Sequence, residues 1–316
     1  MSPAPVFVSV YNRPDHFQKC ISALQAADLA SETLLYIASD KEKEDSEKDA
    51  VEKVRSIIRG IRGFKKVVPF FRERNLGFPK SINDAWCPVL KDHGSAIFLE
   101  DDVLVAKGFL RFMNLALTKY ENHPRVQAVC GWSWASHPAW PKTHYFLRAF
   151  SAWGFGCWYH KEYEAEKFPE TAQRFMNRWH LLAKANRIMP HALHFLKKIG
   201  EEGAPITDIS KSLACIENDH FCVFPKKTLI QNIGHDGTGL HCTTENLHGM
   251  GETWNESIEK LDEIPLHELA CHRQASARYF QGPFHYWALL RYYKPAQPAR
   301  KKYAGYKSVI KKLLKR

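Results

Sequence analysis

Three consecutive carboxylates, Glu100, Asp101 and Asp102, interrupt an apolar stretch of the sequence that begins at Ala96. Acids are rare in strands, and a buried carboxylate is costly unless it is paired or bound to a cation. Oxygen ligands of this kind suit a hard divalent cation such as Mg²⁺ or Mn²⁺. The alternative is a surface turn in which Asp101 or Asp102 caps a helix that begins near Gly108.

Four apolar segments in the first third of the chain are typical of β-strands, and helical patterns separate them. The predicted strands are Val6–Val10, Thr33–Asp40, Lys65–Arg72 and Ser95–Asp102. Predicted helices begin at Pro14, within the charged segment after Lys41, and at Gly77. Strands that alternate with helices form a parallel sheet with helices on both faces, so we expect an α/β fold.

Polar side chains follow each predicted strand at its carboxyl end, where ligands bind in such sheets. They are Tyr11, Asn12 and Arg13 after the first strand, Asp40 after the second, Arg74 and Asn75 after the third, and the acids after the fourth. Gly77 permits a close backbone approach, and Arg74 and Lys80 supply positive charge for a phosphate. The alternative for Arg74–Ser81 is an ordinary loop between a strand and a helix. A cation at the acids could bridge the diphosphate of a nucleotide.

The second half of the chain is less regular and is rich in Trp, Gly and His. Its sequence predicts a strand near Val126, an aromatic and glycine-rich loop over Ser151–Tyr163, helices over about 164–200 and over Thr207–Asn218, and a glycine–histidine loop at His235–Asn246. Glycines around these histidines suggest a loop that closes over a bound ligand.

The composition predicts a folded protein with a basic end. The 316 residues are 45% hydrophobic and 13% aromatic, and the net charge is +11. Most of the excess charge lies in Tyr292–Arg316, which has many basic residues and no acid. The rest of the chain is nearly balanced, which disfavours a nucleic-acid-binding core. The tail resembles a basic amphipathic helix that lies on an anionic membrane, the alternative being a solvated basic tail.

Eight cysteines are scattered along the chain and form no CxxC pair, so zinc-ribbon and thioredoxin-like sites have no support. Cysteines on apolar stretches are typical of free thiols in a reducing compartment. The first residues show no signal-peptide pattern, and no apolar run reaches membrane-spanning length. The sequence therefore predicts a cytoplasmic protein.

Three segments, VSVYNRPDHFQKCISAL, RNLGFPKSINDAW and FLEDDVLVAKGFLRFM, together resemble nucleotide-sugar glycosyltransferases of the GT-A fold. The likeness is to bacterial enzymes related to the N-acetylglucosaminyltransferase I type and to family 2, in which Glu-Asp-Asp takes the place of Asp-X-Asp. The later segments SAWGFGCW and NIGHDGTGLHC also resemble that group. The resemblance covers about Val6–Cys242, without the charged insert Lys41–Lys53 and the basic tail.

The resemblance implies a role for each matching residue. Those that would contact the nucleotide or its phosphates are Tyr11, Asn12, Arg13, Asp40 (to the base), Arg74, Asn75, Gly77 and Lys80, with Asn83 nearby. Asp101 would contact the ribose or donor sugar, Asp102 would be the main metal ligand, and His241 would contact the metal or diphosphate. The acceptor would meet the aromatic faces of Trp153, Phe155 and Trp158, the alternative being plain core residues.

Inverting transfer needs a general base, normally an Asp or Glu, to take the proton of the acceptor hydroxyl. The resemblance places an acid where Asp208 begins the helix Thr207–Asn218, with Glu217 and Asp219 as lesser candidates. The alternative is that Asp208 is there only because an acid in the first turn is favourable for the helix dipole.

Taken together, these features predict a glycosyltransferase that requires Mn²⁺ or Mg²⁺ and uses a nucleotide-diphosphate sugar, with UDP favoured. Residues 1–105 would bind the donor, 106–255 the acceptor, and 256–316 would form a basic helical extension. The acceptor would be a glycan or lipid-linked molecule of cell-envelope polysaccharide or lipopolysaccharide synthesis, at the inner face of the membrane. The alternatives are a sugar nucleotidyltransferase and a non-catalytic basic protein that binds membrane or nucleic acid. The first is disfavoured because Ser9–His16 lacks the glycine-rich phosphate loop of that class.

Overall fold

The structure is a computed structural model, and it describes residues 2–77, 80–133, 143–161, 174–175, 177–188, 196, 207–237 and 258–266. His241, the basic C-terminal segment and most of the predicted helix over 164–200 lie outside the described residues. None of the helices in these ranges combines the length and apolar character that crossing a membrane requires.

The strands and helices in the described residues follow the predicted order in the first third of the chain. The strands are β1 (Val6–Val10), β2 (Leu34–Ser39), β3 (Lys66–Phe71), β4 (Ser95–Glu100), β5 (Val103–Val105), β6 (Val126–Cys130), β7 (His144–Leu147), β8 (Phe155–Trp158), β9 (Phe221–Pro225) and β10 (Ile230–Asn232). The helices are α1 (Pro14–Gln25), α2 (Lys48–Gly60), α3 (Lys80–His93), α4 (Phe109–Tyr120), α6 (Trp179–Ile188) and α8 (Thr207–Asn218), with short 3-10 turns η1 (Ala30–Glu32), η2 (Asp45–Glu47) and η3 (Tyr159–Lys161).

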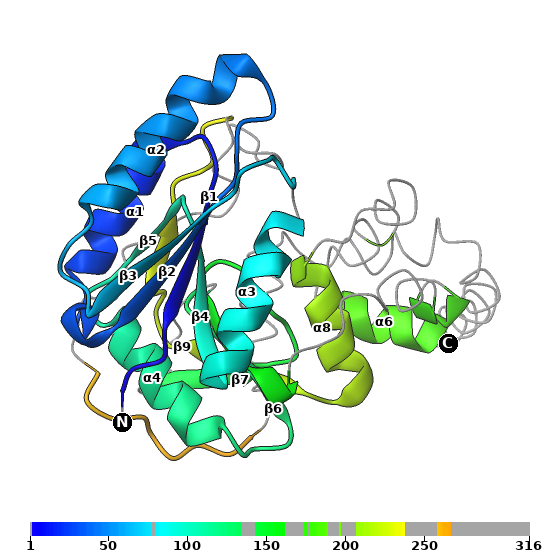
Figure 1. Ribbon diagram of the computed structural model, residues 1–316. Helices are drawn as coiled ribbons and strands as arrows, with labels where there is room; N and C mark the ends of the chain where they lie inside the picture. Colours follow the sequence, from blue (N-terminus) through cyan, green and yellow to red (C-terminus); the bar gives the residue numbers. More distant parts are fainter. Residues whose placement is uncertain are drawn as a thin grey trace, which may run out of the picture.

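One eight-stranded sheet runs through the molecule in the order β3-β2-β1-β4-β8-β6-β9-β7 (Figure 1). The strands β3, β2, β1 and β4 are parallel, and β6 is parallel to β9. β8 is antiparallel to β4 and β6, and β7 is antiparallel to β9. The predicted α/β fold, with a mainly parallel sheet flanked by helices, is confirmed. Residue 105 is the predicted boundary between the donor-binding and acceptor-binding halves. The sheet contains strands from before and after this residue.

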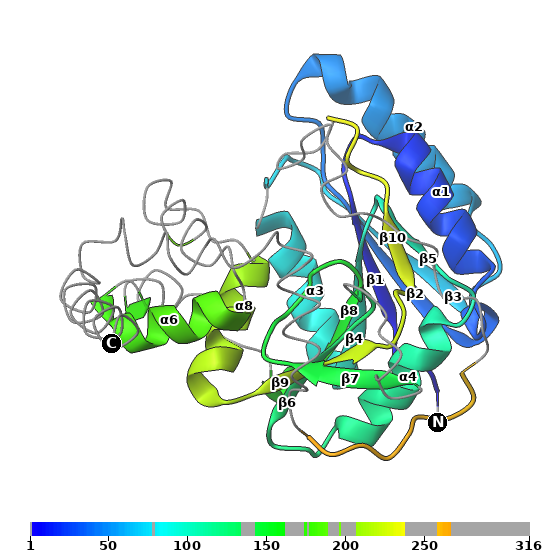
Figure 2. The same cartoon turned by 180° about the vertical axis from the view of Figure 1, so that it is seen from behind.

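The alternating side chains of the strands divide the core between two faces of the sheet. In β1, Val6, Val8 and Val10 pack on one face with α1, α2 and α4, whereas Phe7 packs on the other face with α3 and α8. Figures 1 and 2 show α1 and α2 side by side on one side of the sheet and α3 on the other. Because β1 to β4 are parallel, their carboxyl ends meet at one edge.

A second, two-stranded sheet brings distant parts of the chain to this edge. β5 pairs antiparallel with β10, so that Val103 lies opposite Asn232 (Figure 2). The segment that follows Asn232 therefore runs past the acids that precede Val103. This pairing positions the residues directly after β10 beside the acidic triplet.

The predicted loop over Ser151–Tyr163 is wrong at its centre, because Phe155–Trp158 form β8 between β4 and β6. Gly156, which favours a loop locally, lies where α4 packs closely on the strand. A Cβ at Gly156 would lie 3.1 Å from side-chain atoms of Met113 and Leu117 in α4. The helix covers this part of the sheet closely because β8 has no side chain at that position.

Candidate active site

The acidic triplet lies at the carboxyl end of β4. The strand ends at Glu100, and Asp101 and Asp102 form the turn into β5. Both Asp side chains are buried, with only 4% and 5% of each residue exposed. The helix α4 begins after Gly108 without a side-chain cap, which excludes the alternative in which an acid of this turn caps that helix.

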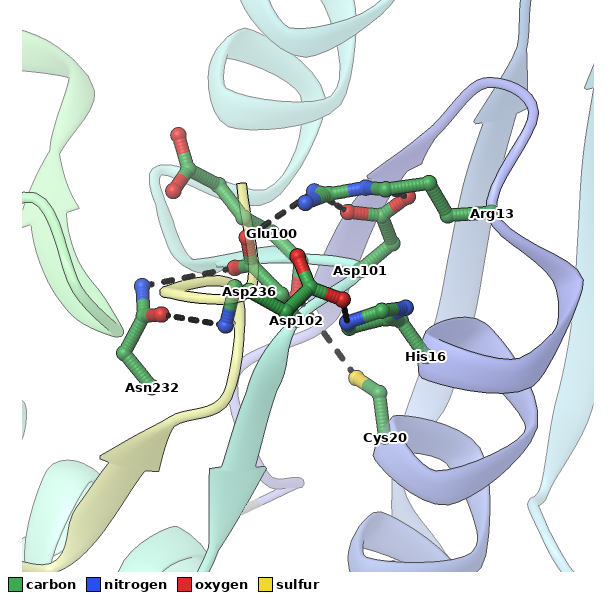
Figure 3. A network of polar contacts seen from close by, with 9 residues as sticks. Arg13, His16, Cys20, Glu100, Asp101, Asp102, Asn232 and Asp236 are labelled. Atoms are coloured by element: carbon green, nitrogen blue, oxygen red, sulfur yellow. Dashed lines mark hydrogen bonds and ion pairs between the residues drawn. The ribbon is translucent and has the colours of Figure 1, made fainter. Parts of the chain in front are cut away.

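The guanidinium of Arg13 lies against both of these carboxylates (Figure 3). Its Nη2 atom forms ion pairs with Asp101 Oδ1 and, at 2.9 Å, with Asp102 Oδ2. Its Nε donates a long hydrogen bond of 3.4 Å to Asp101 Oδ2. The carboxyl group of Glu100 extends away from Arg13, as expected for the neighbouring position on a strand. The ends of β1 and β4 are thus joined by an arginine held between two acids.

The segment after β10 closes the other side of Asp102. The Ile233 N–H donates to the Asp102 carbonyl oxygen at 2.9 Å, and Asn232 Nδ2 lies 3.5 Å from Asp102 Oδ1. The Gly234 N–H donates to Asn232 Oδ1 at 2.8 Å. A Cβ at Gly234 would lie 2.2 Å from Asp102 Oδ2, so only glycine allows this close approach.

Gly234→Ala is therefore expected to destabilise the protein by about 1–3 kcal/mol, because the new methyl group would force Asp102 or the backbone after β10 to move. Urea unfolding measures the change. The matched control is Gly60→Ala at the end of α2, where a Cβ meets nothing within 4 Å. That variant is expected to unfold at an equal or slightly higher urea concentration. Equal unfolding midpoints for Gly234→Ala and the wild type would contradict the prediction.

The acids of the turn and α8 carry more negative charge than Arg13 neutralises. Burial, and then the Asp102, Asp208 and Asp101 carboxylates, raise the pKa of Glu100 to about 8. Burial also raises the pKa of Asp101 to about 6, although Arg13 acts in the opposite direction. Such an excess of buried acid favours binding of a further cation.

A hard divalent cation fits the donor atoms of this turn. Within the described residues, no three His, Cys, Asp or Glu side chains form a ready metal centre. Mg²⁺ and Mn²⁺ sites often need only one or two carboxylates, because substrate phosphates and water complete them. Asp102 and Asp101 supply oxygen atoms of this kind. His241, the other predicted metal contact, lies outside the described residues.

Asp208 lies in the first turn of α8, as predicted, and its charge contributes to the raised pKa of Glu100. Its Oδ1 atom accepts a hydrogen bond of 2.6 Å from the Ala152 N–H. Burial raises the pKa of Asp208 to about 6, while the Ala152 hydrogen bond and Lys211 act in the opposite direction. A carboxylate with this pKa can accept a proton near neutral pH.

The two lesser candidates for the general base are held by arginines. Arg174 Nη2 and Nε lie 2.9 and 3.0 Å from the two oxygens of Glu217. Asp219 pairs with Arg125 and Arg148, and hydrogen bonding and charge from Arg148 keep its pKa below the usual value in spite of burial. Asp208 therefore remains the better candidate among these three acids.

The Asp40 carboxylate binds backbone N–H groups in this structure, and its predicted hydrogen bonds to a base stay a prediction. Its carboxylate accepts hydrogen bonds from the N–H groups of Lys41 (2.9 Å), Leu76 (3.1 Å) and Gly77 (2.9 Å). The Asn75 side chain in turn donates to the Lys41 carbonyl oxygen at 2.5 Å. Asp40 and Asn75 thus hold the loop after β3 against the end of β2. Gly77 adopts φ +71°, a conformation that favours glycine.

Three other predicted phosphate or nucleotide residues lie at the exposed rim beside this loop. They are Arg74, Lys80 and Asn83. The Nζ atom of Lys80 lies 3.5 Å from Asp84, one turn further along α3. Their predicted contacts to a nucleotide stay predictions.

Glu47, in the charged insert Lys41–Lys53, contacts two of the predicted nucleotide residues. Tyr11 Oη and Asn12 Nδ2 donate to the two Glu47 oxygens at 2.5 and 2.9 Å. The Glu47 carboxylate also closes a capping box with Glu44. The Glu44-to-Glu47 spacing was the only local signal for this structure. Tyr11 and Asn12 are thus held by the insert that the resemblance does not cover.

Two of the predicted acceptor aromatics belong to the core, which corrects their assignment. Trp158 is 1% exposed, and its Nε1 donates to the Leu117 carbonyl oxygen at 3.1 Å. Phe155 is 5% exposed and packs against Phe98 in the sheet. Neither ring offers a free face to a sugar. Trp153 is only partly buried and lies edge-to-face with His235, with ring centroids 5.8 Å apart.

His16 in α1 connects the glycine–histidine segment to the first helix. Its Nε2 lies 3.1 Å from Asp236 Oδ2, two residues beyond Gly234 (Figure 3). Together with the Ile233 hydrogen bond, this contact holds residues 233–236 across the acidic turn.

No protein-family model and no curated protein sequence matches the chain. Solved structures that are similar to parts of it include the following three. S. aureus TarS is 19% identical, with a TM-score of 0.30, over 44% of this chain and 23% of its own length. The mannosyltransferase PcManGT from Pyrobaculum calidifontis, in complex with GDP-Man and Mn²⁺, is 15% identical, with a TM-score of 0.37, over 69% of each chain. Mouse xyloside xylosyltransferase 1, in its apo form, is 9% identical, with a TM-score of 0.37, over 69% of this chain and 83% of its own.

The chain thus spans about a quarter of the length of TarS. All three TM-scores lie below 0.5. The functional assignment therefore depends on the chain's own residues and on the geometry of the site.

Proposed function

We propose that the protein is a metal-dependent glycosyltransferase that moves a sugar from a nucleotide-diphosphate sugar to an acceptor hydroxyl. The observation that carries this proposal is the grouping of acids at the carboxyl end of β4. Asp101 and Asp102 are buried beside Arg13, and Asp208, whose pKa is raised, interacts electrostatically with Glu100 of the same triplet. This arrangement supports one site for a cation and diphosphate and a separate site for a proton acceptor.

The donor would lie across the ends of β1, β2 and β4. Asp102 and Asp101 would hold Mn²⁺ or Mg²⁺, and the resemblance adds His241. When bound, the cation would neutralise charge that develops on the departing diphosphate. Tyr11 and Asn12 would line the nucleotide pocket. The resemblance favours UDP as the nucleotide.

Asp208 would act on the acceptor. As the acceptor oxygen bonds to the anomeric carbon, the bond from that carbon to the diphosphate oxygen breaks. Asp208 takes the proton of the acceptor hydroxyl, and attack opposite the leaving group inverts the anomeric centre. Trp153 is the partly exposed aromatic residue at which a sugar acceptor could stack.

The resemblance and the basic tail support a more specific biological role. We infer that the enzyme transfers a hexosyl or N-acetylhexosaminyl group to a glycan or lipid-linked acceptor in cell-envelope polysaccharide or lipopolysaccharide synthesis. It would act in the cytoplasm at the inner face of the membrane, where Tyr292–Arg316 would contact anionic lipid.

Calorimetric titration of UDP and GDP, each with Mn²⁺ and with EDTA, tests the donor site. One nucleotide is expected to bind with Mn²⁺ and to lose that binding in EDTA, since the acids alone would repel a diphosphate. Slow release of nucleoside diphosphate from the matching sugar nucleotide would show the reaction type. A sugar nucleotidyltransferase would instead form pyrophosphate from a nucleoside triphosphate and a sugar phosphate. Absence of binding under all four conditions would refute the proposed function.

A further inference from the structure

The guanidinium of Arg13 occupies the two carboxylates to which the proposed function assigns the cation. We infer that Arg13 is an internal counter-cation that competes with the divalent metal for Asp101 and Asp102, and that a nucleoside diphosphate relieves this competition by binding the displaced guanidinium. This inference rests on the proposed function. It makes metal and nucleotide binding interdependent through one side chain.

The contacts of Arg13 support direct competition. Its Nη2 atom lies between one oxygen of Asp101 and one of Asp102, so it occupies the position from which a cation would bridge the two acids. Both carboxylates are nearly inaccessible, whereas 19% of the Arg13 side chain is exposed. The arginine is therefore the more solvent-accessible partner of these ion pairs.

The remaining terminal nitrogen of Arg13 points to an anion. Nη1 is buried and has no hydrogen-bond partner within the described residues. It lies 3.3 Å from the position of a Cβ on Gly234, so it is close to the segment after β10. A buried donor without a partner is costly, and a guanidinium fork binds phosphate oxygens in a bidentate manner. A diphosphate beside Gly234 would satisfy this atom.

The balance of charge explains why the two ligands should bind together. One guanidinium and two carboxylates together leave a net charge of −1, which a single further positive charge would neutralise. A divalent cation beside the guanidinium would therefore be repelled by it. A diphosphate supplies negative charge to both cations. Each ligand should therefore raise the affinity for the other by the same factor.

Titration of the full-length protein with Mn²⁺ alone tests this inference by calorimetry or by the EPR signal of free Mn²⁺. Arg13→Gln is expected to bind Mn²⁺ about tenfold more tightly than the wild type, within the usual range of coupling between two ligands. The factor by which UDP or GDP raises Mn²⁺ affinity should fall correspondingly. Arg111→Gln is the matched control, because Arg111 pairs with Asp28 and Glu259 away from the acids.

Arg13→Lys separates competition from a general change of electrostatic field and remains informative if Arg13→Gln fails to fold. Lysine keeps the charge but loses the fork, so competition predicts Mn²⁺ affinity above that of the wild type. Unchanged Mn²⁺ affinity in the folded Arg13 variants, with intact binding of Mn²⁺ and nucleotide by the wild type, would overturn the inference and leave the proposed function standing. Failure of the wild type to bind any nucleotide with Mn²⁺ would overturn both.

Discussion

Asp208→Asn is expected to lower kcat for sugar transfer by about 10²–10⁴-fold while the Kd values for Mn²⁺ and nucleotide stay unchanged. The amide has nearly the same shape, and its oxygen can still accept the hydrogen bond from the Ala152 N–H. It cannot take the proton of an acceptor hydroxyl. Steady-state kinetics with saturating donor and acceptor, together with nucleotide titration, separate the loss of chemistry from a loss of binding.

The pH dependence of transfer gives an independent test of the same residue. Because the Asp208 carboxylate must be ionised to act as a base and its pKa is raised to about 6, kcat should rise as the pH increases through about 6. The residual kcat of Asp208→Asn should not show this rise with pH. A wild-type kcat that stays constant between pH 5 and 7 would mean that another group takes the proton of the acceptor hydroxyl.

Asp208 should also reduce the stability of the folded protein at neutral pH. Its folded pKa lies above the ordinary value, so the ionised form is disfavoured on folding, and this cost is present when the pH exceeds the folded pKa. Asp208→Asn is therefore expected to raise the free energy of unfolding at pH 8 by about 1–3 kcal/mol and to have little effect near pH 4. A residue that served only to support the helix dipole would instead lower stability when its charge was removed.

Glu217→Gln is the matched control on the same helix. Glu217 is held by Arg174 and was a lesser candidate for the base. Its replacement should leave kcat close to the wild-type value and should lower stability through the lost ion pair. A large loss of kcat in Glu217→Gln, with little loss in Asp208→Asn, would transfer the catalytic role to Glu217.

The sequence was sufficient to predict the parallel half of the sheet because the signals there are local. The strand β1 matches its predicted bounds, Val6–Val10, and the helix Thr207–Asn218 also matches. Each of these two predictions depends on the spacing of apolar residues and on residues that end a strand or helix within a few positions. Once those strands are parallel, the meeting of Arg13 with the residues after β4 follows from topology.

The rest of the site depends on contacts between distant segments, and no local pattern shows them. β5 and β10 have three residues each, too few to show a strand period, yet their pairing places Gly234 against Asp102. In the sequence, Glu47 is one of several acids in a charged segment, and only the fold places it beside Tyr11. Trp158 is predicted to meet the acceptor because the resemblance places SAWGFGCW on the acceptor side, although the sheet and α4 bury it.

Asp102→Asn is expected to weaken Mn²⁺-dependent nucleotide binding by about 100-fold or more, since even partners outside the metal's own ligands often cost 10–100-fold. Asparagine keeps the volume that packs under Gly234 and the backbone hydrogen bond from Ile233. It removes the charge that a hard cation needs. Titration of the nucleotide at saturating and at zero Mn²⁺ measures the loss, and only the metal-dependent part of the affinity should disappear.

Asp219→Asn controls for the removal of one negative charge elsewhere. Asp219 pairs with Arg125 and Arg148, and its φ of 58° is one that asparagine tolerates well. Nucleotide and Mn²⁺ affinities should be unchanged in this variant. A comparable loss of binding in Asp219→Asn would mean that net charge, rather than ligation by Asp102, governs the site.

The strongest test compares the two partners of one ion pair. If Arg13 and Asp102 only stabilised the fold through their 2.9 Å contact, removing either would have the same consequence. Metal competition predicts opposite signs, because Arg13→Gln frees the carboxylates for Mn²⁺ whereas Asp102→Asn removes one of them. In the Asp102→Asn background the gain from losing Arg13 should be smaller, since the arginine there competes for Asp101 but no longer for Asp102.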